Sequence, residues 1–259
     1  SFGGMPAIHC VPMFSGIDTR SGVPQEWGSM VFNASPGLGA GVGCDGWPVG
    51  LGPAALGGQK IISVEISEKL YPMRIDRQEI ALDSMGVGED IGGPGVVIRI
   101  TPTSGPMECL TFGDGQINPP YGALGGTPGM GGGNYKEDLN TGKRTYYSAK
   151  AHLMIDEGEV WVGNSTGGGG RGDPLKRAPE VVLESVFDGM VSLERALETH
   201  GVVINESTMT IDYVKTKKLR KKIRKARGRL ETTTPNYPNA GNWVEQNIRP
   251  AEEYLIDSQ

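Results

Sequence analysis

Glycine is the feature that most constrains the fold of this chain. The 259 residues include 41 glycines, about 16 percent of the sequence, against roughly 7 percent in ordinary proteins. The glycines are clustered, because 37 of them lie in residues 1–173. They follow no Gly-X-Y period, so a collagen triple helix is excluded. We therefore expect a globular chain whose glycine-rich loops pack against other polypeptide.

The first two thirds of the chain carry the patterns of short β-strands. Residues 1–58 contain brief apolar stretches between glycines and prolines, which predicts loops and short strands. After them, alternating or β-branched stretches bounded by Gly or Pro are typical of strands. The predicted strands are residues 61–66, 71–82, 95–101, 106–112, 147–155 and 159–162.

The apolar spacing changes to that of helices after residue 173. One helix is predicted from near Pro179 to Gly189, and a second, capped by Ser192, ends at Gly201. A third helix carries the basic segment 215–229. The fold class expected is thus α+β. Its predicted parts are a Gly-rich β-dominated domain (1–173), a helical region ending in a basic helix (174–230) and an extended arm that contacts another subunit (231–259).

Charge is strongly segregated along the sequence. Residues 215–229 hold 10 of the 25 Lys and Arg residues and no acid, which leaves 15 cations against 30 acids, a net charge of −15, in the rest of the chain. Such a basic helix needs anions nearby, from the chain's own acidic body, another subunit or nucleic acid. No aromatic residues lie between the cations to stack on bases. This favours a solvated or subunit-facing helix over nucleic-acid binding.

Cysteine usage and hydropathy point to one compartment. Cys10, Cys44 and Cys109 are too few and too far apart for a disulfide framework or a Cys-x-x-Cys metal knuckle. No apolar run approaches the roughly 20 residues that a membrane-spanning helix needs. The sequence therefore predicts a cytoplasmic protein that does not enter a membrane.

The sequence gives little support for a nucleotide-binding motif. Residues 41–46, GVGCDG, have the GxGxxG spelling, but Pro36 precedes them and Trp47-Pro48 follows them. Dinucleotide binding requires a strand before this motif and a helix after it, so that the pyrophosphate meets a helix N-terminus. No GxxxxGK[ST] sequence is present for a phosphate-binding loop of the P-loop class. We expect any ATP that the reaction uses to be bound by another chain.

Other candidate catalytic groups are isolated. His152 and His200 have no neighbour at metal-ligand spacing, and only His9-Cys10 forms an adjacent pair. Ser1 combines a hydroxyl with a free amine, a self-activating nucleophile in some enzymes, but removal of an initiator Met or a cut without catalysis is favoured. We therefore assign no catalytic, cofactor-binding or metal-binding residue to this chain from its sequence.

Three blocks of the sequence resemble one known family. They are VEISEKLYPMRIDRQEIALDSMGVGEDIGGPGVV (64–97), PPYGALGGTPGMGGGN (119–134) and NSTGGGGRGDPLKRAPEVVLESVFDGMVSLERALETHGVV (164–203). In order and spacing they are similar to the C-terminal part of the hydantoinase B family. That family includes the larger half of 5-oxoprolinase and the α-type subunits of acetone and acetophenone carboxylases. Residues 1–4, SFGG, also resemble a TFGG segment of the family.

The resemblance implies a subunit of an ATP-dependent, multi-subunit carboxylase that joins bicarbonate to a ketone of the acetone or acetophenone type. The alternatives are a subunit of a hydantoinase or 5-oxoprolinase-type cyclic amide hydrolase, and a non-catalytic scaffold subunit. ATP and a divalent metal (Mg, Mn or Zn) are implied, bound by other subunits. The implied partners are a hydantoinase A-like ATP-handling subunit, the upstream half of a hydantoinase B-like subunit and other small subunits, with neither nucleic acid nor membrane.

The sequence also departs from the family pattern. Met85 stands where the family usually has Gly, and Ile91 stands where Arg is common. The upstream half of the family, with the His and Asp residues that bind metal in some members, has no counterpart here. The chain is therefore not expected to hold a complete active site. Glycines 167–170 allow close backbone approach, and we expect them to serve packing before ligand binding.

Overall fold

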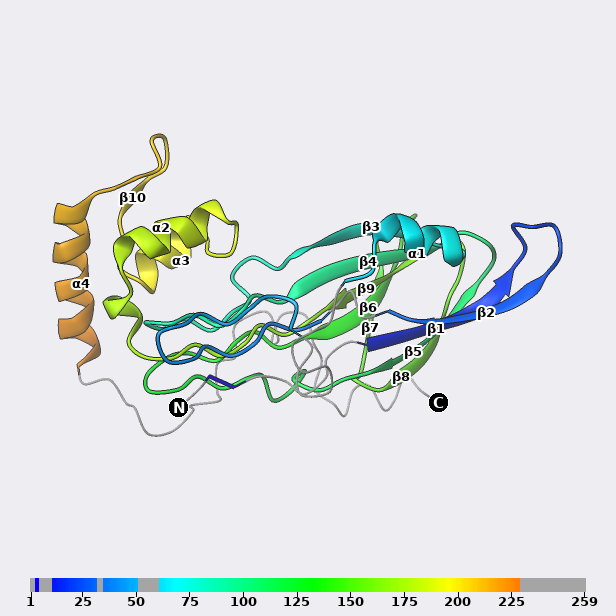
Figure 1. The fold of residues 1–259 in the computed structure, drawn as a ribbon, viewed down its shortest axis with the longest axis horizontal. Helices are drawn as coiled ribbons and strands as arrows, with labels where there is room; N and C mark the ends of the chain where they lie inside the picture. Colours follow the sequence, from blue (N-terminus) through cyan, green and yellow to red (C-terminus); the bar gives the residue numbers. More distant parts are fainter. Residues whose placement is uncertain (1–2, 5–10, 32–34, 51–60, 229–259) are drawn as a thin grey trace.

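The structure is a computed structural model that describes residues 3–4, 11–31, 35–50 and 61–228. Within these ranges the expected α+β class is confirmed, with the strands first and most of the helices last (Figure 1). The strands are β1 (Val11–Asp18), β2 (Gln25–Met30), β3 (Met73–Ile80), β4 (Val96–Pro102), β5 (Met107–Phe112), β6 (Gly133–Asp138), β7 (Arg144–Tyr147), β8 (Ala151–Ile155), β9 (Glu159–Asn164), β10 (Ile204–Asn205) and β11 (Thr210–Ile211). The helices are α1 (Val64–Leu70), the 3-10 turn η2 (Pro174–Lys176), α2 (Pro179–Phe187), α3 (Leu193–Glu198) and α4 (Tyr213–Arg227).

Two antiparallel sheets form a sandwich at one end of the molecule (Figure 1). The first has the strand order β2-β1-β5-β8 and the second the order β3-β4-β9-β6-β7. Apolar side chains from the inner faces of both sheets share one buried cluster. At its centre Phe14 of the first sheet meets Trp161 of the second edge to face, with ring centroids 5.4 Å apart. Strands such as β4, β5 and β8 alternate between more and less buried residues, so their inward side chains build the core between the sheets.

One predicted strand is wrong. Residues 61–66 were expected to be extended, but helix α1 begins at Val64. The cause is local capping chemistry, because the Ser63 hydroxyl accepts a hydrogen bond from the backbone N–H of Ile66. Lys69 in the last turn complements the negative end of the helix. α1 then ends just before Pro72 and packs on β3.

The other strands predicted after residue 70 correspond to β3, β4, β5, β8 and β9, with boundaries shifted by a few residues. The predicted strand 147–155 is interrupted, because β7 ends at Tyr147 and β8 begins at Ala151 in the other sheet. β6 begins at the end of the glycine-rich stretch 122–134 and is not among the strands predicted from the sequence. The order and type of these five strands are thus confirmed, while the assignment of β7 and β8 to different sheets follows from tertiary packing.

Glycine-rich segments cross the middle of the molecule between the sandwich and the helices (Figure 1). They run through residues 37–50, 84–95, 120–132 and 165–172, and they bond to one another through backbone groups. Gly93 N–H donates to the carbonyl of Leu38 at 2.8 Å, and Gly168 N–H donates to the carbonyl of Gly93 at 2.9 Å. We call these segments the glycine bundle.

Several glycines of this bundle are required by the close approach of backbone segments. A Cβ on Gly168 would lie 1.9 Å from the carbonyl oxygen of Leu38, and a Cβ on Gly37 would lie 1.8 Å from that of Gly93. Each contact is with backbone, so no side chain can turn aside to make room. The sequence led us to expect that these glycines meet other polypeptide. The structure shows instead that the backbone they meet belongs to this chain.

The helical end of the molecule has its own apolar cluster. Met85 and Ile91, which depart from the family pattern, are both buried there, beside Val182 of α2 and Ala196 of α3. The predicted helices are confirmed: α2 starts at Pro179, and the Ser192 hydroxyl caps α3. The two departures therefore supply apolar packing between the glycine bundle and the helices.

The arginines of helix α4 bond to the rest of the chain, whereas its lysines are exposed to solvent. Arg220 donates to the carbonyls of His200 and Arg177, and Arg224 donates to that of Leu175. Arg227 donates two hydrogen bonds, of 3.0 and 2.9 Å, to the Asp173 carboxylate. The exposed lysines of the helix are Lys215, Lys217, Lys218, Lys221, Lys222 and Lys225. The three arginines thus hold α4 against the preceding segments of the chain. We call the six exposed lysines the lysine ridge.

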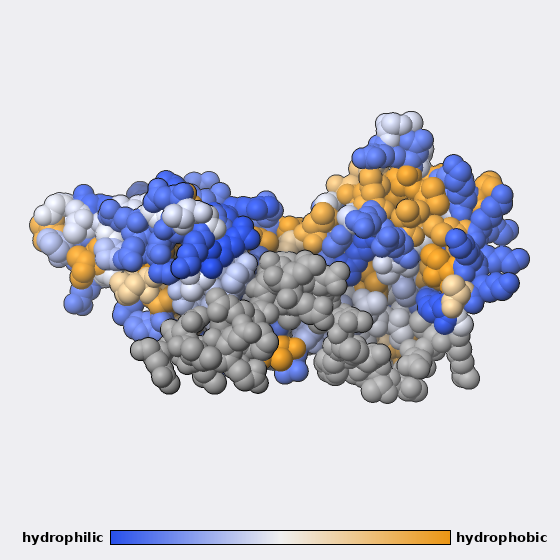
Figure 2. Space-filling view, turned by 180° about the vertical axis from the view of Figure 1, so that it is seen from behind, coloured by the Kyte–Doolittle hydropathy of each residue, from blue (hydrophilic) through white to orange (hydrophobic). Residues whose placement is uncertain are grey.

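Two further expectations concern the ends and the surface. The predicted contact arm, residues 231–259, lies outside the described residues. Within the described ranges, no helix combines the length and the apolar character that crossing a membrane would take. Figure 2 shows hydrophobic residues gathered over the helical end, on the face seen from behind.

Candidate functional site

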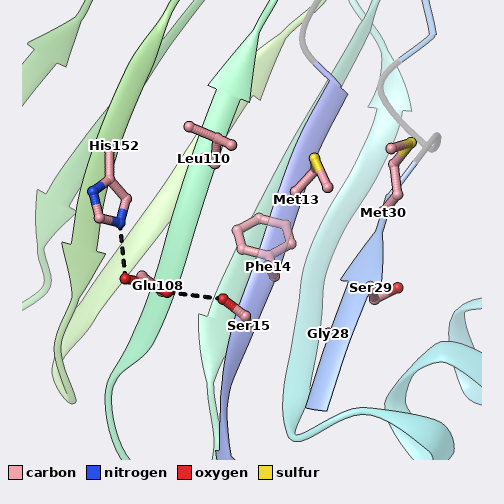
Figure 3. A pocket seen from close by; sticks show the side chains of 9 residues that line it. All are labelled: Met13, Phe14, Ser15, Gly28, Ser29, Met30, Glu108, Leu110 and His152. Atoms are coloured by element: carbon pink, nitrogen blue, oxygen red, sulfur yellow. Dashed lines mark hydrogen bonds and ion pairs between the residues drawn. The ribbon is translucent and has the colours of Figure 1, made fainter. Parts of the chain in front are cut away.

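A concave surface of about 620 Å³ lies on the outer face of the sheet β2-β1-β5-β8 (Figure 3). Its apolar lining includes Met13, Met30 and Leu110. Its polar lining includes Glu108 and His152, and Ser15 lies beside them. Every strand of the sheet contributes, so the surface is built by the sheet as a whole. We call it the sheet concavity.

Strand register brings these side chains together. Met13 of β1 lies opposite Met30 of β2 on one side and Leu110 of β5 on the other. Leu110 in turn lies opposite His152 of β8. Because residues two apart on a strand share a face, Ser15 and Glu108 fall in the next row of the same face. Local alternation in the sequence thus places the row Met30-Met13-Leu110, which ends in His152, beside the polar pair Ser15 and Glu108.

The polar side chains form a continuous hydrogen-bonded chain, in which His152 at the end of the Leu110 row reaches across to Glu108 (Figure 3). The Ser15 hydroxyl donates to Glu108 Oε2 at 3.0 Å, and His152 Nε2 lies 2.9 Å from Glu108 Oε1. The hydrogen bond with His152, followed by that from Ser15, lowers the pKa of the Glu108 carboxyl below its usual range. Glu108 is therefore an anion at neutral pH, held between a hydroxyl and an imidazole.

This order of groups is unsuited to nucleophilic catalysis. A serine nucleophile needs a base in contact with its hydroxyl, and the carboxylate then orients that base from behind. Here the carboxylate of Glu108 stands between Ser15 and His152, so no base of the described chain is hydrogen-bonded to the hydroxyl except an ionised, weakly basic Glu. The arrangement is suited to binding a partner that carries a hydrogen-bond donor.

The remaining histidines and the amino terminus are separate from this site. His200 is fully buried at the helical end, with Nδ1 3.3 Å from the carbonyl of Pro174. His9-Cys10 and Ser1 lie outside the described residues. Of the sequence candidates that the structure describes, only His152 takes part in the sheet concavity. Glu108 and Ser15 were not predicted, although the alternation in residues 106–112 already places Glu108 and Leu110 on one face.

The GxGxxG-like segment 41–46 belongs to the glycine bundle. A tight turn joins Gly41 to Cys44, and no helix begins in residues 41–50. A Cβ on Gly46 would lie 1.9 Å from the Leu38 carbonyl oxygen, so that glycine is used for packing. The Asp45 carboxylate within this segment binds Arg177 through two bonds of 2.7 Å. The segment is therefore a structural corner, and its charged residue holds a buried arginine.

Metal ligands are sparse in the part of the chain that the structure describes. No group of three or more His, Cys, Asp or Glu side chains there is arranged to hold an ion. The divalent metal that the family resemblance implies thus has no fitting ligand set among these residues, and we assign none of them to it.

His200 makes the stability of the fold dependent on pH. Burial, opposed by its hydrogen bond to Pro174 and aided by nearby arginines, lowers its pKa from the ordinary 6.5 to about 4. Between pH 6.5 and pH 4, His200 is mostly protonated in the unfolded chain and mostly neutral in the folded chain. Stability is therefore full above about pH 6.5 and falls as the pH drops toward 4.

We expect the His200 contribution to be about 2.5 kcal/mol between pH 7 and pH 4.5, because stability falls by roughly 1.4 kcal/mol per pH unit only below pH 6.5 and by less as the pH approaches 4. Urea unfolding at both pH values measures it. The His200→Gln variant, which cannot take up the proton, should lose this part of the pH dependence. The His152→Gln variant, at an exposed histidine, should keep it. Equal pH dependence in the parent and His200→Gln would contradict the prediction.

Comparison with known proteins identifies the chain. A family model described as hydantoinase B/oxoprolinase matches residues 5–174, more than half of the sequence. The chain belongs to this family. The resemblance inferred from the three sequence blocks is thereby confirmed.

Several curated relatives in the family are subunits. The beta subunit of the caprolactamase of Pseudomonas jessenii is 32% identical over 197 residues, which is 74% of this chain and 33% of that protein. The B-type subunit of a putative D-/L-hydantoinase from a Pseudomonas species is 32% identical over 161 residues, 61% of this chain and 26% of that protein. The acetone carboxylase alpha subunit of Xanthobacter autotrophicus is 26% identical over 63% of this chain and 26% of its own length. The chain thus spans a third or less of these relatives.

Two solved structures resemble the fold. A nucleotide-free structure of acetone carboxylase covers 96% of this chain with a TM-score of 0.73 at 20% identity, a similarity that concerns the fold alone. The ATP-dependent caprolactamase of Pseudomonas jessenii covers 85% of this chain with a TM-score of 0.67 at 26% identity. This chain corresponds to 35% and 38% of those two chains.

Proposed function

We propose that this chain is part of the B-type component of a cytoplasmic, ATP-dependent enzyme of several subunits that acts on a small carbonyl compound. The observation that carries the proposal is the family match over residues 5–174. The names of the relatives support it, since caprolactamase, hydantoinase and acetone carboxylase each include a subunit similar to this chain. The partners are a hydantoinase A-like ATP-handling subunit, the upstream half of a hydantoinase B-like subunit and other small subunits.

Hydrolysis of a cyclic amide is the first candidate reaction. In this chemistry, phosphate from ATP activates the amide oxygen, and water then opens the ring. The two relatives that are 32% identical to this chain, one from a caprolactamase and one from a hydantoinase, support it over a ketone substrate. Both names denote enzymes that act on cyclic amides.

Carboxylation of a ketone is the second candidate. There, ATP activates bicarbonate or the enolised ketone before the new carbon–carbon bond forms. The 26% identity to an acetone carboxylase alpha subunit supports this reading. It is also the reaction that the resemblance of the three sequence blocks implies, but the higher identities give the cyclic amide more support.

We infer that this chain contributes structure and docking surface, while other subunits or the upstream half bind ATP and the divalent metal. Two observations support this division. The chain corresponds to a third or less of its curated relatives. Its polar chain also places the Glu108 carboxylate between Ser15 and His152, an order unsuited to a serine nucleophile. If this chain contributes no catalytic group at all, it is a non-catalytic scaffold subunit.

ATP turnover by the purified assembly tests the proposed reaction. With caprolactam or a hydantoin we expect ATP hydrolysis at least 10-fold above the rate without substrate. The parallel assay contains bicarbonate with acetone or acetophenone, and a response to that mixture alone would select the second candidate. The matched control is the same preparation from cells that lack this chain. ATP turnover that responds to neither substrate class would overturn both reactions.

A further inference from the structure

The outer face of the first sheet is unusually apolar for a surface in water. Met13, Met30, Leu110 and Met154 all lie on it, each between 37 and 46 percent exposed. An antiparallel sheet with one solvated face normally carries polar side chains on that face. Contiguous apolar surface rimmed by polar groups marks an interaction site, and methionine is well suited to irregular contacts. This face is therefore built to be covered.

We propose that the sheet concavity is the docking surface for a polypeptide segment of the B-type component that lies outside this chain. The segment presents apolar side chains to the methionines and one hydrogen-bond donor or cation to Glu108. The inference rests on the proposed function only in placing this chain within a B-type component. The relatives supply the argument for the occupant, since about two thirds or more of each lies outside the part that this chain matches.

Charge complementarity defines the chemistry of the contact. The Glu108 carboxylate already accepts bonds from Ser15 and His152, so covering it leaves less unsatisfied charge than covering a bare carboxylate would. Each carboxylate oxygen has a further lone pair to offer. A lysine, an arginine or a backbone N–H of the incoming segment fits this position.

The geometry favours a polypeptide over a small ligand. The concavity is spread across every strand of the sheet, and its apolar row continues from Met30 through Met13 to Leu110. Met154 of β8, opposite Glu108, extends the apolar surface beyond the concavity itself. A chain segment crossing the strands covers this whole length, whereas a compact ligand leaves part of it in water.

Methionine oxidation measures coverage directly. Met13, Met30 and Met154 should oxidise readily in the isolated chain, whereas Met73, Met85 and Met107, which are almost fully buried, should be protected. In the assembly purified from its native source, we expect the first three to react at least 10-fold more slowly with hydrogen peroxide. Met209, half-buried at the β10–β11 turn away from the sheet, reports whether the oxidant remains active.

The outcomes of this footprint separate the occupants. Equal oxidation of the three methionines in the chain and in the assembly would overturn the proposal. Protection in the isolated chain that disappears on dilution, together with a doubled mass, would assign the face to a second copy and overturn it as well. Because the readout does not involve ATP, protection without any ATP turnover would leave the docking surface standing while the proposed reaction failed.

A charge placed on the face provides the second test. Leu110→Glu should unfold cooperatively like the parent, since Leu110 is 46% exposed. In the assembly, the same variant should reduce recovery of the other chains at least 10-fold and restore oxidation of Met13. The matched control is Leu139→Glu, which is 49% exposed at the β6–β7 turn of the other sheet and should leave the assembly intact. Normal recovery with Leu110→Glu would contradict the proposal.

Discussion

Replacing Gly168 with alanine will abolish the native fold. The new Cβ would lie 1.9 Å from the oxygen and 2.3 Å from the carbon of the Leu38 carbonyl, distances that no side-chain rotation can relieve. That oxygen accepts the hydrogen bond from Gly93 N–H, so moving Leu38 breaks a connection to a third segment of the glycine bundle. Overpacking ordinarily costs roughly 1–3 kcal/mol and more where backbone must shift. Here we expect a loss of at least about 5 kcal/mol, comparable with the whole stability of many domains.

The Gly168→Ala prediction has a matched control in the same molecule. A Cβ on Gly28 of β2 would meet only the Phe14 carbonyl oxygen at 3.7 Å, an ordinary contact. The free energy of unfolding of Gly28→Ala should therefore stay within about 1 kcal/mol of the parent value. Alanine also restricts the unfolded chain more than glycine does, which favours the folded state. Soluble yield and urea unfolding followed by circular dichroism measure both variants. A cooperative transition of Gly168→Ala near the parent midpoint would refute the account of the bundle.

Removing the carboxylate of Asp45 should cost about 3 kcal/mol, because breaking an ion pair leaves an uncompensated buried charge. Arg177 is only 5% exposed, and both of its terminal nitrogens donate to Asp45 at 2.7 Å. In Asp45→Ala the buried guanidinium keeps two longer bonds, to the Glu89 carbonyl and the Ser185 hydroxyl, each 3.2 Å. The loss includes the bond that Asp45 accepts from Ile91 N–H.

Comparison with a surface pair isolates the effect of burying the arginine, because Asp45 itself is 39% exposed. Glu79 pairs with Arg77 on β3, and both side chains are about half exposed. Glu79→Ala should change the free energy of unfolding by less than about 1 kcal/mol. The double variant Asp45→Ala/Arg177→Met should be more stable than Asp45→Ala alone, because the buried charge has gone. Urea unfolding midpoints measure these stabilities. Equal losses of stability in Asp45→Ala and Glu79→Ala would contradict the prediction.

Local patterns were sufficient where neighbouring residues decide the structure. Pro179 and Ser192 marked helix starts correctly, because capping depends on the nearest backbone groups. The same chemistry misled the strand prediction at 61–66, where the Ser63 cap outweighs the apolar alternation. The sequence pattern therefore predicted α+β architecture well and failed where two local signals competed.

Partners across the chain were beyond the reach of local patterns. Ser15 and Glu108 meet only because β1 and β5 pair across 93 residues of sequence. The glycine bundle was recognised as an excess of glycine, but composition does not tell which backbone segment each glycine will face. The family resemblance is the basis of the proposed function in an ATP-dependent enzyme of carbonyl compounds. It was silent about the sheet concavity, which depends on register.

The separation of arginine from lysine in α4 has a consequence for chemical labelling. Amine-directed acylating reagents attack lysine and spare guanidinium groups. Full acylation of the lysine ridge would remove six positive charges from one edge of the molecule, while Arg220, Arg224 and Arg227 keep their bonds to the body. The electrostatic field of this edge is thus chemically adjustable without releasing the helix that carries it.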